Sequence, residues 1–125
     1  MDRKFVLVSF CIAIAGLCLG IFMAASKNHG QFVTHAHTML IGFVLSFIYG
    51  LCHKLWLENT VNLLAKCQFY IHLVGTCIVI VGLFLGYGNF VPFETLDPML
   101  ALGSISVLTA VILMLVLFLK SCKST

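Results

Sequence analysis

The sequence predicts an all-α membrane protein that crosses the bilayer with four helices. Of the 125 residues, 62% are hydrophobic and only 9% are charged, whereas a soluble domain carries about 25% charged residues. Four apolar stretches are each long enough for a spanning helix, which needs ~20 residues. The connections between these stretches are too short to hold another domain. We therefore expect a single four-helix transmembrane domain over residues 1–125.

This composition excludes several classes of protein. There are too few charges to cover the surface of a soluble enzyme, and the strong hydrophobicity argues against a disordered regulator or a nucleic-acid binder. The six cysteines form no C-x-x-C pair, and most lie in or beside apolar runs. A thiol in such a run packs as a small hydrophobic group. The chemistry of the protein must therefore depend on very few residues.

The first apolar stretch, about 5–25, follows the basic residues Arg3 and Lys4. A signal peptide has the same order of features, but its apolar region is usually only about 7–15 residues long. In addition, Phe22-Met23-Ala24 is a poor cleavage site. We expect this stretch to be retained as a helix.

The remaining spans are expected at about 32–56, 67–88 and 98–119. Asp97 is a natural N-cap and Pro98 is favoured at the first helical position, so we expect the last helix to begin there.

The basic residues predict the direction of every helix, because cytoplasmic segments are enriched in Lys and Arg. If the N-terminus is cytoplasmic, one basic residue, Lys27, faces outward, where Glu94 and Asp97 join it. Both termini are then cytoplasmic, and the second helix runs from outside to inside. The expected location is the bacterial inner membrane. The other six basic residues face the cytoplasm: Arg3, Lys4, Lys54, Lys66, Lys120 and Lys123.

Small residues predict how the helices pack. Gly16 and Gly20 form a G-x-x-x-G pattern in the first helix, and Gly82 and Gly86 form another in the third. Such residues allow close approach of helix backbones in a membrane. We expect most of these contacts to lie within one protomer, although some are available to an oligomer. The fourth helix has a similar set: Ala101, Gly103, Ser104, Ser106 and Ala110.

Two histidines, His35 and His37, lie near the outer end of the second helix. Ionisable residues at membrane depth are costly and usually functional. At about 100° per residue, positions two apart point about 200° away from each other. One helix therefore cannot direct both imidazoles at a single metal ion, and each ring needs its own partner.

The two faces of this helix differ. The face of His35 is small and polar, which predicts a seam against other helices; it continues through Met39, Gly42, Ser46, Tyr49 and His53. The face of His37 is apolar, as a flat apolar cofactor with a metal centre would require; it continues through Ile41, Val44, Ile48 and Leu51.

The other histidines have simpler interpretations. His29 lies in the outer loop and His53 lies beside Lys54 near the inner end of the second helix. We expect both to be interfacial and solvated. His72 lies about two turns into the third helix, where a hydrogen bond to a backbone carbonyl or a hydroxyl group is expected.

The segment Val33-Thr-His-Ala-His-Thr-Met-Leu-Ile-Gly-Phe, continuing to Gly50 and Trp56, resembles the H-x-H helix of the catalytic subunit of heme–copper oxidases and nitric oxide reductases. In that family this helix also runs from outside to inside with its histidines near the outer end. The family's subunit has twelve helices in three arcs of four. The chain resembles one such arc, and the matching segment covers about one fifth of it.

The resemblance implies a homotrimer in which three chains stand for the three arcs. His37 of one protomer and His35 of the next would then ligate one non-covalent b-type heme, and Met39 is an alternative axial ligand or a packing residue. Bis-histidine ligation suits electron transfer or heme handling, with a redox protein or quinone as partner. The chain lacks the C-x-x-C-H motif of covalent heme attachment.

The chain also departs from the family. It lacks the adjacent histidine pair and the histidine–tyrosine feature of the copper site, and its predicted spans contain no acidic residue. We therefore do not expect oxygen reduction with proton pumping, and no residue is predicted to be catalytic.

Two other interpretations stay open. His29, His35 and His37 lie within nine residues, and imidazole also suits copper, zinc or nickel, so an outer-surface metal site is an alternative. From a flexible loop, His29 would reach one of the other two histidines, but not both, because they lie on opposite faces. Alternatively, the protein is an accessory membrane subunit without a cofactor, in which the histidines only form hydrogen bonds.

Overall fold

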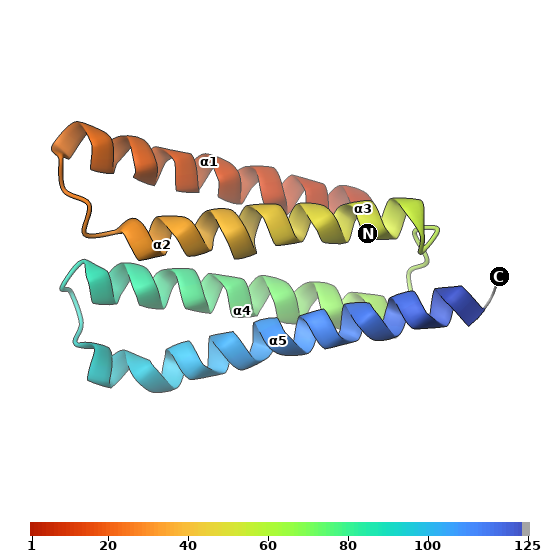
Figure 1. Ribbon diagram of the computed structural model, residues 1–125. Coiled ribbons are helices and arrows are strands. Elements are labelled where there is room, and N and C mark those ends of the chain that lie inside the picture. The colour runs from red at the N-terminus through yellow and green to blue at the C-terminus, as the bar shows by residue number, and fades with distance from the viewer. Residues whose placement is uncertain (124–125) are drawn as a thin grey trace.

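The computed structural model describes residues 1–123. Within that range, four helical segments are long and apolar enough to cross a membrane (Figure 1). The second of them, Phe32–Leu55, is continuous but changes its helical type twice, and we call it the second span. The elements in chain order are α1 (Asp2–Ser26), α2 (Phe32–His37), the π-helix η1 (Thr38–Leu45), α3 (Ser46–Leu55), α4 (Leu63–Tyr87) and α5 (Phe93–Lys123).

The helices run antiparallel to their chain neighbours (Figure 1). α1 packs along the second span, and α4 packs along α5. The second span and α4 lie between these outer helices and contact each other through α2 and η1. This arrangement places the most polar helix of the chain in the middle of the bundle, which is where its side chains find partners.

Two helix starts differ from the sequence prediction. α4 begins at Leu63 rather than at residue 67, because the Asn62 side chain caps the helix by accepting a hydrogen bond from the Ala65 amide at 2.8 Å. α5 begins at Phe93, so the prediction that it starts at Pro98 is wrong.

The early start of α5 has a local explanation. The carbonyl oxygen of Pro92 accepts hydrogen bonds from the amides of Thr95 and Leu96, at 3.1 and 3.3 Å. The first turn therefore forms before Asp97 is reached. Pro98 then lies inside the helix, where its missing N–H removes only one helical hydrogen bond.

The π-helix η1 was not predicted from the sequence. Its i→i+5 hydrogen bonds widen the helical turn, which keeps residues four apart closer to one face. Thr38, Gly42 and Ser46 have this spacing, and all three are buried. The prediction that this face of the second span packs against other helices is confirmed, but its residues contact different neighbours. Gly42 faces Ile12 of α1, whereas Ser46 bonds to α4.

The glycine pairs allow close contacts within the protomer. A Cβ atom added at Gly20 would lie 2.9 Å from the His35 ring of the second span. A Cβ atom at Gly82 would lie 2.6 Å from Leu100 of α5. Gly16 and Gly86 pack in the same way, against Met39 and Phe93 respectively. The expectation that these glycines serve packing inside one protomer is confirmed.

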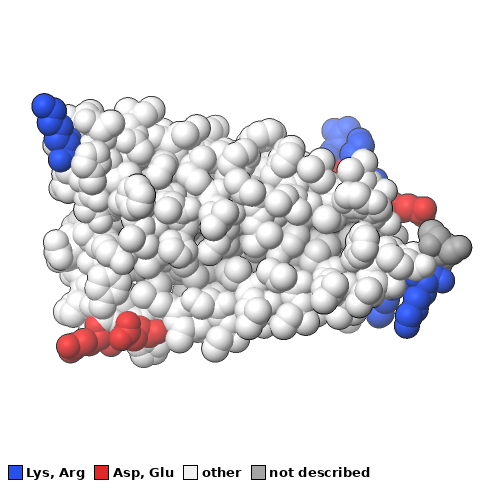
Figure 2. Space-filling view, viewed as in Figure 1, with Lys and Arg blue, Asp and Glu red and all other residues white. Residues whose placement is uncertain are grey.

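Charged side chains lie at the two ends of the bundle, with an uncharged band between them (Figure 2). We call one end the basic end, because it holds six of the seven basic residues: Arg3, Lys4, Lys54, Lys66, Lys120 and Lys123. The opposite end, which we call the Lys27 end, carries the α1–α2 and α4–α5 connections with Lys27 and Glu94. Both ends of the described chain, residues 1 and 123, lie at the basic end (Figure 1).

A close backbone approach of α4 to α5 at Gly75 gives a testable prediction. A Cβ atom added at Gly75 would lie 2.7 Å from the Ser106 Cβ and 3.1 Å from the carbonyl oxygen of Gly103. Because backbone atoms cannot move aside cheaply, Gly75→Ala should lower the free energy of unfolding by about 1–3 kcal/mol. Chemical unfolding in detergent, followed by circular dichroism, measures this change.

Gly16→Ala is the comparison variant. There the nearest atom belongs to the end of the flexible Met39 side chain, which is free to rotate away. The loss should therefore be smaller than for Gly75→Ala. Equal losses at the two positions would contradict this account of the α4–α5 contact.

Candidate cofactor site on the second span

His35 and His37 point to different neighbours, as their spacing predicts. His35 faces α1, and its Nδ1 lies 2.8 Å from the carbonyl oxygen of Gly16. His37 bonds within its own helix, with Nδ1 2.9 Å from the carbonyl oxygen of Val33. Its ring lines a groove formed with α4 and α5. Within one protomer the two imidazoles are not brought together.

These two hydrogen bonds determine which ring nitrogen is protonated. A carbonyl oxygen only accepts hydrogen bonds, so Nδ1 is the donor in both His35 and His37. In the neutral imidazole, Nε2 then carries the lone pair. Metal-ligating histidines commonly have this arrangement, in which the second nitrogen donates to a carbonyl group and fixes the ring. Both side chains are therefore in the form that a metal centre requires.

The groove at His37 has a volume of about 360 Å³ and opens on the surface of the bundle. Among its lining residues, which all belong to the described range 1–123, His37 and Ser104 carry the only polar side chains. The apolar lining consists of Ile41, Val79, Leu83, Leu100 and Val107.

The apolar face predicted beyond His37 is confirmed only in part. Ile41 lines the groove with His37, whereas Leu51 lies in a different hollow that α1 lines. Val44 and Ile48 are 40% and 45% exposed. An imidazole beside an apolar groove is chemically compatible with a flat apolar group that carries a metal at its centre, such as a heme.

Met39 lies elsewhere. Its sulfur packs against Gly16 of α1, on the same side of the second span as His35. The sequence left two roles open for Met39, an axial ligand or a packing residue. Its contact with Gly16 is that of a packing residue. It does not reach the groove at His37, whose lining does not include it.

The remaining histidines lie apart from this site. His29 is exposed in the α1–α2 connection. Nε2 of His72 forms a 2.8 Å hydrogen bond with the Ser46 hydroxyl, which confirms the predicted type of partner. Within residues 1–123, no three His, Cys, Asp or Glu side chains gather closely enough to hold a metal ion. His29, His35 and His37 are therefore not brought together as a group of three.

The prediction that His53 is solvated is wrong. The side chain is fully buried, and its ring stacks on Phe5 with 5.4 Å between centroids. The first turn of α1 covers it, because α1 packs along α3 at the basic end. The neighbouring Lys54 is exposed, so the charge beside His53 in the sequence gave a misleading signal.

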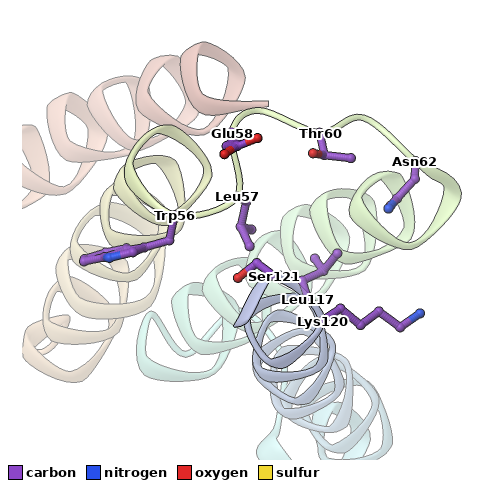
Figure 3. Close-up of a pocket in the computed structure, with 8 residues that line it drawn as sticks. All are labelled: Trp56, Leu57, Glu58, Thr60, Asn62, Leu117, Lys120 and Ser121. Atoms are coloured by element: carbon purple, nitrogen blue, oxygen red, sulfur yellow. The ribbon is translucent and has the colours of Figure 1, made fainter. Parts of the chain in front are cut away.

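A second pocket lies at the basic end, between the α3–α4 connection and α5 (Figure 3). Its volume is about 200 Å³, and its lining contains no histidine or cysteine. Trp56 and Lys120 extend away from each other across it (Figure 3). This pocket offers no imidazole or thiolate ligand for a heme, so the groove at His37 is the better candidate.

No protein-family model, curated protein or solved structure matches this chain. The fold alone shows that this is an all-α protein with four helices that are long and apolar enough to cross a membrane.

The Ser46–His72 hydrogen bond gives a second prediction. Both side chains are buried, so Ser46→Ala leaves Nε2 of His72 without its partner. Such a loss costs about 1–3 kcal/mol of the free energy of unfolding. Ser106→Ala is the matched control, because the Ser106 hydroxyl bonds only to the Leu102 carbonyl of its own helix. Chemical unfolding of both variants tests this, and equal stability of the two would contradict it.

Proposed function

We propose that this chain is a heme-b-binding integral membrane protein for electron transfer or heme handling. The observation that carries the proposal is the state of His37. Its Nδ1 donates to the Val33 carbonyl, and its ring lines an apolar groove between the second span, α4 and α5. This leaves Nε2 as the ligating atom. When bound, the heme supplies one-electron redox chemistry at its iron.

The roles of the protein residues follow from this placement. The Val33 carbonyl orients the His37 ring and raises its basicity as a ligand. The aliphatic residues of the groove, including Val79 and Leu83, would bind the apolar faces of a heme and exclude water from it. Both effects would favour electron transfer over the binding of an external substrate if a second histidine leaves the iron no open position.

For the second axial ligand we propose His35 of a neighbouring protomer. Within one chain, His35 faces α1 and His37 faces away from it, so an intramolecular pair is geometrically excluded. His35 has the same Nδ1 hydrogen bond to a carbonyl group and is only partly buried. The second span resembles a helix of the oxidase catalytic subunit, which has three arcs of four helices. Three chains arranged like those arcs would bring His35 of one protomer close to His37 of the next. The homotrimer is part of this proposal.

The proposed orientation places the basic end in the cytoplasm. Six of the seven basic residues lie there, and cytoplasmic segments of membrane proteins carry this excess of Lys and Arg. His35 and His37, at the start of the second span, are then close to the outer surface of a bacterial inner membrane. A redox protein or a quinone would meet the heme from that side.

The spectroscopic prediction concerns His37. Protein purified from membranes should show a Soret band, and His37→Ala should abolish it, because the axial ligand inside the groove is lost. His35→Ala should leave the iron with one open position and so produce a high-spin spectrum. The measurement is the absorption spectrum of oxidised and dithionite-reduced protein.

His29→Ala is the matched control, since it makes the same change at an exposed loop histidine, and it should leave the spectrum unchanged. A folded, colourless wild-type protein would refute the proposal and indicate a cofactor-free accessory subunit. Copper or zinc without heme, lost in His29→Ala, would indicate the surface metal site instead.

The oligomer gives a separate prediction. The mass of the purified complex, after subtraction of detergent, should equal three chains of 13.7 kDa together with their hemes. If His35 of the neighbour is the second ligand, His35→Ala and His37→Ala chains mixed in one membrane should recover part of the low-spin spectrum. Multi-angle light scattering and spectroscopy measure these properties, and a monomer with a low-spin heme would contradict the shared site.

A further inference from the structure

The bundle contains a group of buried polar side chains that the proposed heme site does not use. Five residues of α3 and α4 form it, none more than 3% exposed. We call them the core polar cluster: Tyr49, His53, Gln68, His72 and Thr76. Polar residues buried at membrane depth are expensive, and each one requires a physical explanation.

Three members of the cluster, Tyr49, His53 and His72, lie around Phe5 of α1. The Phe5 ring stacks on His53 at a centroid distance of 5.4 Å and lies 6.3 Å from His72. Tyr49 meets His72 edge to face at 4.9 Å. Phe5 itself is fully buried. The cluster therefore lies on the axis of the bundle in its basic half, away from the lipid.

Part of its hydrogen-bonding capacity is satisfied inside the protein. Nε2 of His72 bonds to Ser46, and the amide nitrogen of Gln68 donates to the Ala110 carbonyl of α5 at 3.3 Å. The remaining buried polar atoms have no hydrogen-bond partner within residues 1–123. They are the Tyr49 hydroxyl, both ring nitrogens of His53, Oε1 of Gln68, Nδ1 of His72 and the Thr76 hydroxyl.

This number of unpartnered atoms is too costly for a dry core. Each buried unpaired group costs about 1–3 kcal/mol, and lipid supplies no hydrogen bonds. Apolar residues of similar size would have avoided that cost. A ligand that satisfies these atoms is therefore indicated.

The chemistry of the cluster identifies the ligand. Oε1 of Gln68 accepts only, the Tyr49 and Thr76 hydroxyl groups both donate and accept, and the His53 ring offers one donor and one acceptor. A metal ion needs acceptors alone, and no group of three metal-ligating side chains exists within residues 1–123. Water both donates and accepts, and buried waters typically form about three hydrogen bonds to such groups.

The basic end is the nearest source of water. His53 belongs to the last turn of α3, and its carbonyl oxygen accepts a 2.8 Å hydrogen bond from the amide of the exposed loop residue Asn59. On the opposite side, Ser46 and Thr76 lie deeper along the spans. The cluster thus extends from the basic surface into the membrane interior.

We propose that the core polar cluster is a water-binding site, which holds ordered internal water molecules that enter from the basic end. The basic half of the bundle is then a hydrated polar core, although its outer surface faces lipid. This inference is independent of the heme, because it depends on side chains that lie outside the groove at His37.

Radiolytic hydroxyl labelling with mass spectrometry tests the proposal on the purified full-length protein. Radicals formed from bound water modify the side chains beside it, even where bulk solvent has no access. Phe5 and Tyr49 should therefore be labelled, although they are 0% and 3% exposed. The internal control is Phe10 of the same helix, which is 51% exposed and would be covered by lipid or detergent. It should remain at background.

Two variants sharpen the test. Thr76→Val removes one hydroxyl group of the site, and it should reduce the labelling of Phe5 and lower the unfolding midpoint. Thr109→Val makes the same change on α5, where the hydroxyl bonds only to the Ile105 carbonyl of its own helix, and should alter neither. Labelling of Phe5 at the level of Phe10 would overturn the proposal. So would a rise in the stability of Thr76→Val, because it would show a dry core.

Discussion

The second span must satisfy its polar side chains inside the protein, because a surrounding bilayer offers them no hydrogen bonds. This requirement explains why the second span lies between α1 and α4 rather than at the edge of the bundle. It also explains the glycines of α1. They bring the α1 backbone close enough for the Gly16 carbonyl to accept a hydrogen bond from His35.

The two halves of the bundle meet the requirement differently. In the basic half, aromatic and imidazole rings lie around Phe5. Toward the Lys27 end, grooves open on both sides of the second span, one beside Thr34 and Thr38 and the other beside His37.

The widened turn of η1 connects the two halves. It keeps Thr38, Gly42 and Ser46 buried in succession, while His35 and Met39 face α1 and His37 faces α4 and α5. π-helical segments are often found at functional sites. Here the segment begins directly after His37, where the proposed cofactor would bind.

The sequence by itself determined the four spans, their up-and-down order and the end at which the basic residues gather. These properties depend on hydropathy and charge, which are local and additive along the chain. It also determined that His35 and His37 diverge, since that follows from helical spacing alone.

Only the tertiary structure decided which side chains are buried and what they contact. His53 is covered by a residue 48 positions earlier in the chain, Phe5, and no local pattern predicts that contact. The π-helix and the start of α5 at Phe93 arise from packing and from hydrogen bonds that compete with intrinsic propensity. Burial and partner choice are properties of several helices together, and a linear pattern describes only one helix at a time.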